Sequence, residues 1–232
     1  MGKEIYMDGE YLRRNPTWHA EESQWKSKQI IKIISKNKIQ PHSICEIGCG
    51  AGEVLNQMHL EMPEDISFSG YEISPQAFEL CRKREKNRLH FYLGDIFDDE
   101  KAFFDIILAI DLVEHVEDYF GFLRRLREKA IYKIFHFPLN ISVQTVLRPS
   151  QILRFRRGVG HIHYFTKETA IAALTDTGYE VIDYFYTAGG VELPAKTLGG
   201  LLAKLPRKAM FALNQDIAAR FLGGFSLLAL AK

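Results

Sequence analysis

The stretch ICEIGCGAGEV, residues 44–54, decides the fold. It joins a short apolar run to a segment with helical spacing, and it holds three glycines, Gly48, Gly50 and Gly52. Glycines permit a tight turn and let the backbone approach a ligand closely, and the start of a helix offers unpaired N–H groups. The pattern therefore predicts a strand, a ligand-binding loop and a helix in succession.

This loop differs from the glycine pattern that binds dinucleotides. That pattern, G-x-G-x-x-G, requires glycine at position 53, where the chain has Glu53. A carboxylate beside a pyrophosphate is electrostatically unfavourable. Glu46 instead precedes the glycines, which suits a ligand with positive charge and no phosphate. The loop thus counts against a dinucleotide-dependent oxidoreductase, which remains an alternative on the same kind of sheet.

Outward from the loop, strand and helix signals alternate along the chain. We expect strands at residues 43–47, 66–72, 89–93, 103–110, 131–137, 179–186 and 225–231, and helices at 20–37, 53–61, 75–86, 119–129 and 167–177. Helices of this length between strands predict an α/β fold with a doubly wound, mostly parallel seven-stranded sheet covered on both faces. Ligands bind such sheets beyond the carboxyl ends of the strands.

Two further acids stand at the ends of predicted strands. Glu72 ends the second strand, where a carboxylate can accept both hydroxyls of a ribose. Asp95 ends the third strand, where an acid can accept from an exocyclic amine while Ile96 flanks a base. Each acid alone is also an ordinary surface residue, but their joint occurrence at strand ends describes an adenosine site.

These strings resemble those of a known family. The string E-I-G-C-G-A-G, residues 46–52, is similar to motif I of class I S-adenosylmethionine-dependent methyltransferases. Residues 104–118 and 160–181 resemble a subgroup that includes ubiquinone-biosynthesis O-methyltransferases and many natural-product enzymes. The likeness covers roughly residues 20–187. It implies a Rossmann-like methyltransferase fold with an antiparallel last strand, S-adenosylmethionine as the cofactor and S-adenosylhomocysteine as the product.

The resemblance also implies which residues hold the cofactor. They are Glu46, Gly48, Gly50 and Gly52 at the methionine end, Glu72 with its neighbour Ile73 at the ribose, Asp95 with Ile96 at the adenine, and Asp111 with Leu112 beside the fourth strand.

Residues 1–40 are expected to form a helical lid over that pocket, and residues 41–232 the methyltransferase domain. The lid is rich in aromatic and basic side chains, and Tyr11, Trp18 and Lys26 are candidate contacts to the cofactor. Lys26 can pair with the cofactor carboxylate. An equally weighted alternative is a helix packed on the edge of the sheet.

Methyl transfer from a sulfonium is a direct displacement, so the protein mainly aligns the nucleophile with the methyl group. A hydroxyl acceptor also needs a base, for which His115, His161 and His163 are candidates, with His115 and His163 preferred. A loop histidine is also consistent with a purely structural role. Glu114 and His115 resemble part of the divalent-ion site proposed for ubiquinone-type enzymes, but two adjacent residues do not make a metal site, and we expect none.

Two basic segments, at about residues 141–160 and 190–222, are expected to form cap-like insertions over the acceptor. The first contains Arg148, Arg154, Arg156 and Arg157 and no acid. Packed helices with a solvated basic face are the favoured interpretation, and contact with an anionic membrane surface is the less favoured one. Contact of either segment with the acceptor would suit an acidic or lipophilic molecule.

Composition narrows the classes of function. The net charge of +1 over 232 residues gives no overall attraction to nucleic acid, and residues 110–113 lack the motif of enzymes that methylate base amino groups. Three cysteines do not form a disulfide framework, and no apolar stretch is long enough to span a membrane.

We expect a cytoplasmic enzyme that O-methylates a small molecule. A non-catalytic S-adenosylmethionine-binding module is an alternative, and the oligomeric state is left open.

Overall fold

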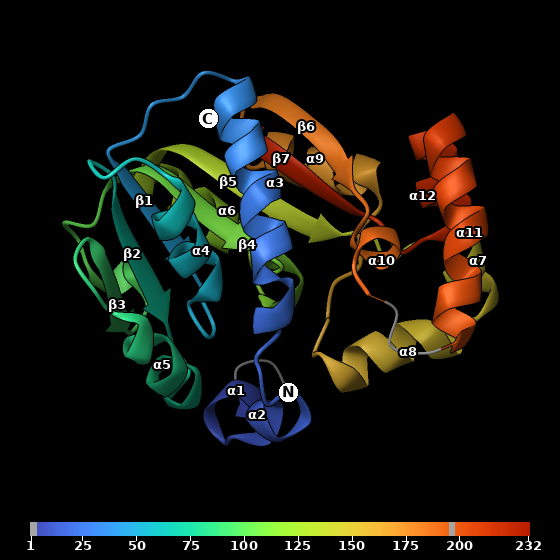
Figure 1. Ribbon diagram of the computed structural model, residues 1–232, viewed down its shortest axis with the longest axis horizontal. Coiled ribbons are helices and arrows are strands. Elements are labelled where there is room, and N and C mark those ends of the chain that lie inside the picture. Colours follow the sequence, from blue (N-terminus) through green and yellow to red (C-terminus); the bar gives the residue numbers. More distant parts are fainter. Residues whose placement is uncertain (1–3, 195–197) are drawn as a thin grey trace.

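Seven apolar runs of the chain form one sheet, in the order β3-β2-β1-β4-β5-β7-β6 (Figure 1). The strands are β1 (Ser43–Ile47), β2 (Ser67–Glu72), β3 (Leu89–Leu93), β4 (Phe104–Ile110), β5 (Ala130–Pro138), β6 (Val181–Thr187) and β7 (Ser226–Ala231). The pairings among β1 to β5 are parallel, and β7 lies antiparallel between β5 and β6. The predicted doubly wound, mostly parallel sheet with an antiparallel last strand is therefore confirmed.

The computed structural model describes residues 4–194 and 198–232. Residues 1–3 of the predicted lid and residues 195–197 of the second predicted insertion lie outside the described residues.

Helices cover both faces of the sheet (Figure 1). Those packed on it are α3 (Ser23–Lys36), α4 (Glu53–Glu61), α5 (Pro75–Cys81), α6 (Tyr119–Leu126) and α9 (Lys167–Asp176). Short 3₁₀ turns connect several elements: η1 (Ala20–Glu22), η2 (Arg82–Arg84), η3 (Ile96–Asp98), η4 (Val113–His115) and η5 (Arg127–Lys129). Two small N-terminal helices, α1 (Glu4–Met7) and α2 (Glu10–Arg14), precede α3 and lie below it in Figure 1.

The remaining helices stand together at one end of the molecule and form what we call the cap (Figure 1). The cap consists of α7 (Val143–Leu147), α8 (Pro149–Gly158), α10 (Gly189–Glu192), α11 (Leu198–Leu213) and α12 (Gln215–Leu222). The chain inserts α7 and α8 after β5, and α10 to α12 between β6 and β7. The division of the chain at residue 40 and the extent of the insertions stay predictions.

Side chains of β4 alternate between two apolar cores, one on each face of the sheet. Ile106 and Leu108 belong to the core that holds buried residues of α3 and α4. Ile107 and Ala109 belong to the core that holds buried residues of α6 and α9. Because successive side chains of a strand point to opposite faces, covering both faces requires an uninterrupted apolar run, which is the pattern of this strand.

Several predicted boundaries are wrong by a few residues, and two of them have a clear cause. The sixth strand begins at Val181 and not at residue 179, because the N–H of Tyr179 donates to the Leu174 carbonyl and closes the end of α9. The helix predicted to run to Lys86 ends at Cys81, and the chain then tightens into η2. Backbone bonds between Lys86 and Leu89 form the turn into β3.

We expect Phe135→Ala in β5 to lower the free energy of unfolding by roughly 3–5 kcal/mol, because the removed ring leaves a cavity in a packed core. Phe135 is fully buried between α6, α9 and the sheet, whereas the matched control Phe103→Ala removes a ring that is 58% exposed. Urea unfolding followed by circular dichroism measures both. Equal losses for the two variants would contradict the assignment of this core.

Candidate active site

The loop between β1 and α4 is built on left-handed glycines. Gly48, Gly50 and Gly52 have φ values of 64°, 55° and 72°, a region that residues with a side chain rarely adopt. Space is also limiting, because a Cβ atom at Gly50 would lie 2.4 Å from Trp18 Cδ1 and one at Gly52 would lie 2.6 Å from the ring of Phe91. The sequence therefore needs glycine at these positions for both conformation and close approach.

Glu72 ties this loop to the end of β2. Its buried carboxylate accepts hydrogen bonds from the backbone N–H groups of Gly50 and Ser74, each at 2.8 Å. Burial raises the pKa of Glu72, and the backbone donors counteract that rise. The carboxylate is thus held in one orientation at the carboxyl edge of the sheet, with the half-buried Ile73 following it.

Asp95 and Ile96 lie at the end of β3, as the sequence predicts, but they play different structural parts. The Asp95 carboxylate caps η3 by accepting from the Phe97 N–H at 3.1 Å. The side chain of Ile96 is fully buried in the core and does not reach the cavity described next. Leu112 packs against the loop at Gly48, so it supports the loop from the side of β4.

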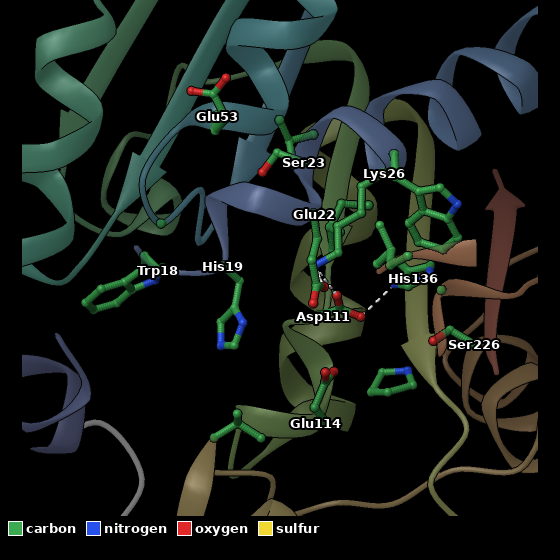
Figure 2. Close-up of a pocket in the computed structure, with 18 of the residues that line it drawn as sticks. Trp18, His19, Glu22, Ser23, Lys26, Glu53, Asp111, Glu114, His136 and Ser226 are labelled. Carbon is green, nitrogen blue, oxygen red and sulfur yellow. Dashed lines mark hydrogen bonds and ion pairs between the residues drawn. The ribbon is translucent and has the colours of Figure 1, made fainter. Parts of the chain in front are cut away.

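A cavity of about 600 Å³ opens beside the loop (Figure 2). Its walls come from the loop itself, from α3, from the end of β4 and from the cap. The predicted cofactor residues Tyr11, Trp18, Lys26, Glu46 and Asp111 line it, as does His115. The structure thus brings together side chains from segments that are far apart in the sequence.

Asp111 forms the centre of an ion-pair network at the base of the cavity (Figure 2). Its carboxylate lies 2.8 Å from Lys26 Nζ and 2.6 Å from His136 Nδ1, and Lys26 also lies 3.4 Å from Glu22. Burial alone would raise the pKa of Asp111, but His136 and Lys26 hold that pKa well below its usual range. Lys26 is therefore paired with two carboxylates of the protein, and its predicted pairing with a cofactor carboxylate stays a prediction.

Glu114, His115 and His161 converge on the same cavity. The Glu114 Oε1 atom lies 3.9 Å from His115 Nε2 and 3.8 Å from His161 Nε2. The carboxyl group is fully buried, and neither of its oxygens has a hydrogen-bond partner among the described residues. Burial raises the pKa of Glu114 well above its usual value and lowers the pKa values of both histidines, that of His161 to about 3.

The far nitrogens of both imidazoles are held in place. His115 Nδ1 lies 3.1 Å from the Gly160 carbonyl oxygen and 2.9 Å from the Tyr6 hydroxyl. His161 Nδ1 lies 2.7 Å from the Asn140 side chain. Such contacts fix the ring orientation and leave each Nε2 directed at Glu114. One ligand atom of each of the three residues lies within 4.8 Å of the others, so this set can hold a divalent ion by ligand type. The absence of a metal requirement stays a prediction.

The structure does not bring His163 to the cavity. Residues 160–165 form no helix. His161 and His163 are two residues apart in the sequence, but their side chains have different surroundings. His161 lines the cavity, whereas the ring of His163 packs on Tyr119 and contacts the Glu117 carbonyl oxygen at 3.2 Å. Backbone bonds from Ile162 and His163 to Glu114 set this course of the chain.

The N-terminal segment brings aromatic rings to the cavity, which Tyr11 and Trp18 line. The rings of Tyr6 and Tyr11 lie 4.9 Å apart, and those of Tyr11 and Trp18 lie 4.6 Å apart. Sequence reasoning missed Tyr6, and it also missed His136 and Asn140. A histidine in the apolar strand around His136 is a detectable signal, since a buried polar side chain needs a partner. Nothing in the sequence marks Tyr6 or Asn140.

Comparison with known proteins agrees with this geometry. Residues 18–184 match a family model described as a methyltransferase domain. Ajmaline N-methyltransferase from Rauvolfia serpentina is 27% identical over 94 residues, which are 38% of this chain and 32% of that protein. The chain therefore spans about a third of the length of the curated relative that it matches.

Solved structures share the fold. Magnesium protoporphyrin IX methyltransferase from Synechocystis PCC 6803, with bound SAH, has a TM-score of 0.59 at 15% identity, covering 90% of this chain and 83% of that one. An N-methyltransferase from Bradyrhizobium japonicum WM9, in complex with S-adenosyl-L-homocysteine, has a TM-score of 0.55 at 15% identity, covering 89% and 84%. At these identities the likeness shows a common architecture and not a common acceptor.

We expect Lys26→Met to lower the free energy of unfolding at pH 7 by about 2 kcal/mol, because it leaves a partly buried Asp111 with one cation fewer. The control Lys28→Met changes an exposed lysine of the same helix. Because the pKa of Asp111 is lowered in the folded state, its stabilising contribution is complete above the unfolded pKa, about 3.9, and declines as the pH falls below it. The free energy of unfolding of wild type should therefore decline below about pH 4, as urea titrations at several pH values would show. Equal free energies of unfolding of the Lys26 and Lys28 variants at pH 7 would contradict the ion pair.

Proposed function

The chain belongs to the family of methyltransferase domains and is an S-adenosylmethionine-dependent enzyme, and from that premise we propose that it methylates a hydroxyl group of a small molecule. The observation that carries the proposal is the convergence of Glu114, His115 and His161 on the cavity beside the glycine loop. The family match decides against the alternative of a dinucleotide-dependent oxidoreductase.

The cofactor is proposed to lie along the loop from Gly48 to Gly52, with its ribose at Glu72. The donors of Gly50 and Ser74 orient the Glu72 carboxylate and leave it lone pairs for two hydroxyls. Glu46 supports the placement of the methionine end of the cofactor. It is buried, lines the cavity and has an oxygen without a partner among the described residues. A cationic ammonium or sulfonium group would compensate that oxygen.

His115 is proposed as the base. The Gly160 carbonyl can only accept, so Nδ1 of His115 carries the proton and Nε2 has a free lone pair. Burial lowers the pKa of His115, which keeps the imidazole neutral at pH 7. S-adenosylmethionine bound at the glycine loop would supply the methyl group and keep the electrons of its carbon–sulfur bond as S-adenosylhomocysteine, and His115 Nε2 would accept the hydroxyl proton of the acceptor. Glu114 lies beside that imidazole, with its Oε1 atom 3.9 Å from Nε2.

We expect Glu72→Ala to weaken binding of S-adenosylhomocysteine by about 10- to 100-fold, or roughly 1–3 kcal/mol, because ribose donors lose their acceptor. The control is Glu79→Ala, which removes an exposed carboxylate from α5. Isothermal titration calorimetry measures both. An unchanged affinity of the Glu72 variant would remove this residue from the cofactor site, and heat with NAD but none with S-adenosylhomocysteine would contradict the proposed cofactor pose.

We expect His115→Gln to lower the rate of methyl transfer by roughly 10²- to 10⁴-fold, because the acceptor loses its base. S-adenosylmethionine with a deuterated methyl group is incubated with a metabolite extract of the expression host, and the labelled product is identified by mass spectrometry. His163→Gln, outside the cavity, serves as the control. Affinity for S-adenosylhomocysteine should stay within about threefold of wild type, since the imidazole acts on the acceptor.

Three results would count against this assignment. Label on a nitrogen or carbon atom of the product would contradict transfer to oxygen. An equal loss of rate in the His115 and His163 variants would contradict the role of His115. Loss of transfer on treatment with a chelator, restored by a divalent ion, would assign the three-residue cluster to a metal.

A further inference from the structure

Helix α11 turns its leucines toward solvent. Leu201, Leu202 and Leu205 are 55%, 63% and 70% exposed. The opposite side of the helix carries Arg207, which donates to the Gly223 carbonyl at 3.2 Å and to the Gln144 side chain at 2.9 Å. Met210 packs against the main core. Arg207 thus links α11 to the rest of the cap, and the apolar face with Leu201, Leu202 and Leu205 is left exposed.

The neighbouring cap helices also expose apolar side chains. Val146 and Leu147 of α7 are 59% and 76% exposed, and Phe221 of α12 is 51% exposed. Helix α12 contacts both α7 and α11, and the three stand together at one end of the molecule (Figure 1). We call these side chains of α7, α11 and α12 the apolar cap surface. Single exposed leucines are ordinary, but a concentration of them on adjacent helices marks an interaction site.

Helices α7, α8 and α11 of the cap carry charge of one sign, whereas α10 and α12 also hold Glu192 and Asp216. The segments 143–158 and 198–213 hold seven basic and no acidic side chains, in a chain whose net charge is +1. Arg148, Arg154, Arg156 and Arg157 are exposed, and no ion pair joins them to a carboxylate in the described part of the chain. The rest of the molecule is correspondingly acidic. The cap therefore suits a surface that is anionic and apolar together.

The same helices border the cavity. Phe155 of α8 and Lys204 of α11 line it, together with Leu193 at the end of α10. Residues on the two sides of α11 thus belong to different surfaces, with Lys204 toward the cavity and Leu201 and Leu205 exposed. Whatever covers the apolar cap surface would lie next to one wall of the active site.

We propose that the cap docks on the surface of a bilayer that contains anionic phospholipids. The leucines of α11 enter the boundary between headgroups and acyl chains, and the arginines of α8 pair with lipid phosphates. No helix among the described residues is long and apolar enough to cross a membrane, so the association is peripheral. A second copy of this chain is the weaker fit, because a symmetric contact would bring two basic surfaces together.

Flotation of the full chain with lipid vesicles tests the docking surface. Vesicles of phosphatidylcholine with about 30% phosphatidylglycerol should carry the protein upward at about 50 mM NaCl and release it at about 500 mM, because salt screens the charges. Vesicles of phosphatidylcholine alone should bind roughly tenfold less. Flotation uses no methyl donor or acceptor, so its outcome is separate from that of methyl transfer.

Two variants locate the surface. Leu202→Glu should reduce vesicle binding roughly tenfold, because it places a charge at the apolar boundary, and Arg154→Glu should do the same by removing and reversing a cation. The matched control is Leu60→Glu on α4, where the native leucine is 64% exposed and lies outside the cap. Calorimetry with S-adenosylhomocysteine verifies that each variant is folded.

Three outcomes would overturn the proposal. The first is an absence of flotation by wild type on anionic vesicles at low salt. The second is an equal effect of the Leu60 and Leu202 variants. The third is a mass in light scattering that corresponds to a dimer and that Leu202→Glu converts to a monomer, since the apolar cap surface would then be covered by a second copy of the chain.

Discussion

The compensation of buried carboxylates is the constraint on which the site depends. Glu46 and Glu114 are buried on one cavity that Asp111 also lines, and the buried Glu72 ties the glycine loop beside that cavity to β2. An ionised carboxylate away from water needs a partner, and the protein supplies partners unequally. Lys26 satisfies Asp111 and backbone donors satisfy Glu72, but Glu46 and Glu114 keep oxygens without partners among the described residues. Two buried carboxyl groups on the cavity wall therefore keep hydrogen-bonding capacity for a bound molecule.

The N-terminal segment contacts both the glycine loop and His115. Trp18 stands against Gly50 of the glycine loop, and the Tyr6 hydroxyl contacts the imidazole of His115. Helix α3 adds Lys26 from the same segment while its isoleucines pack into the core of the sheet. One stretch of chain thus supplies side chains that pack into the core and side chains that line the cavity.

Local sequence patterns predicted most of the fold, but they could not predict contacts between residues that are distant in the sequence. Apolar runs and glycine clusters each span only a few residues, so the strands, the loop and the position of Glu72 could be predicted from the sequence. The pairing of Lys26 with Asp111 and of Asn140 with His161 depends on how distant segments meet. The difference between His161 and His163 depends on which side of an irregular segment faces the cavity, and no periodic pattern fixes that choice.

The antiparallel last strand explains why the cap lies over the site. β6 runs in the direction of β5, because both pair antiparallel with β7. The chain therefore leaves β5 and β6 at the same edge of the sheet, which is also the edge of the glycine loop, and β7 begins there. Both connections must emerge beside the glycine loop. Methyl transfer depends more on the alignment of the reactants than on dedicated catalytic groups. Changes in the helices inserted at this edge can therefore alter the acceptor and the surface of the enzyme without disturbing the sheet.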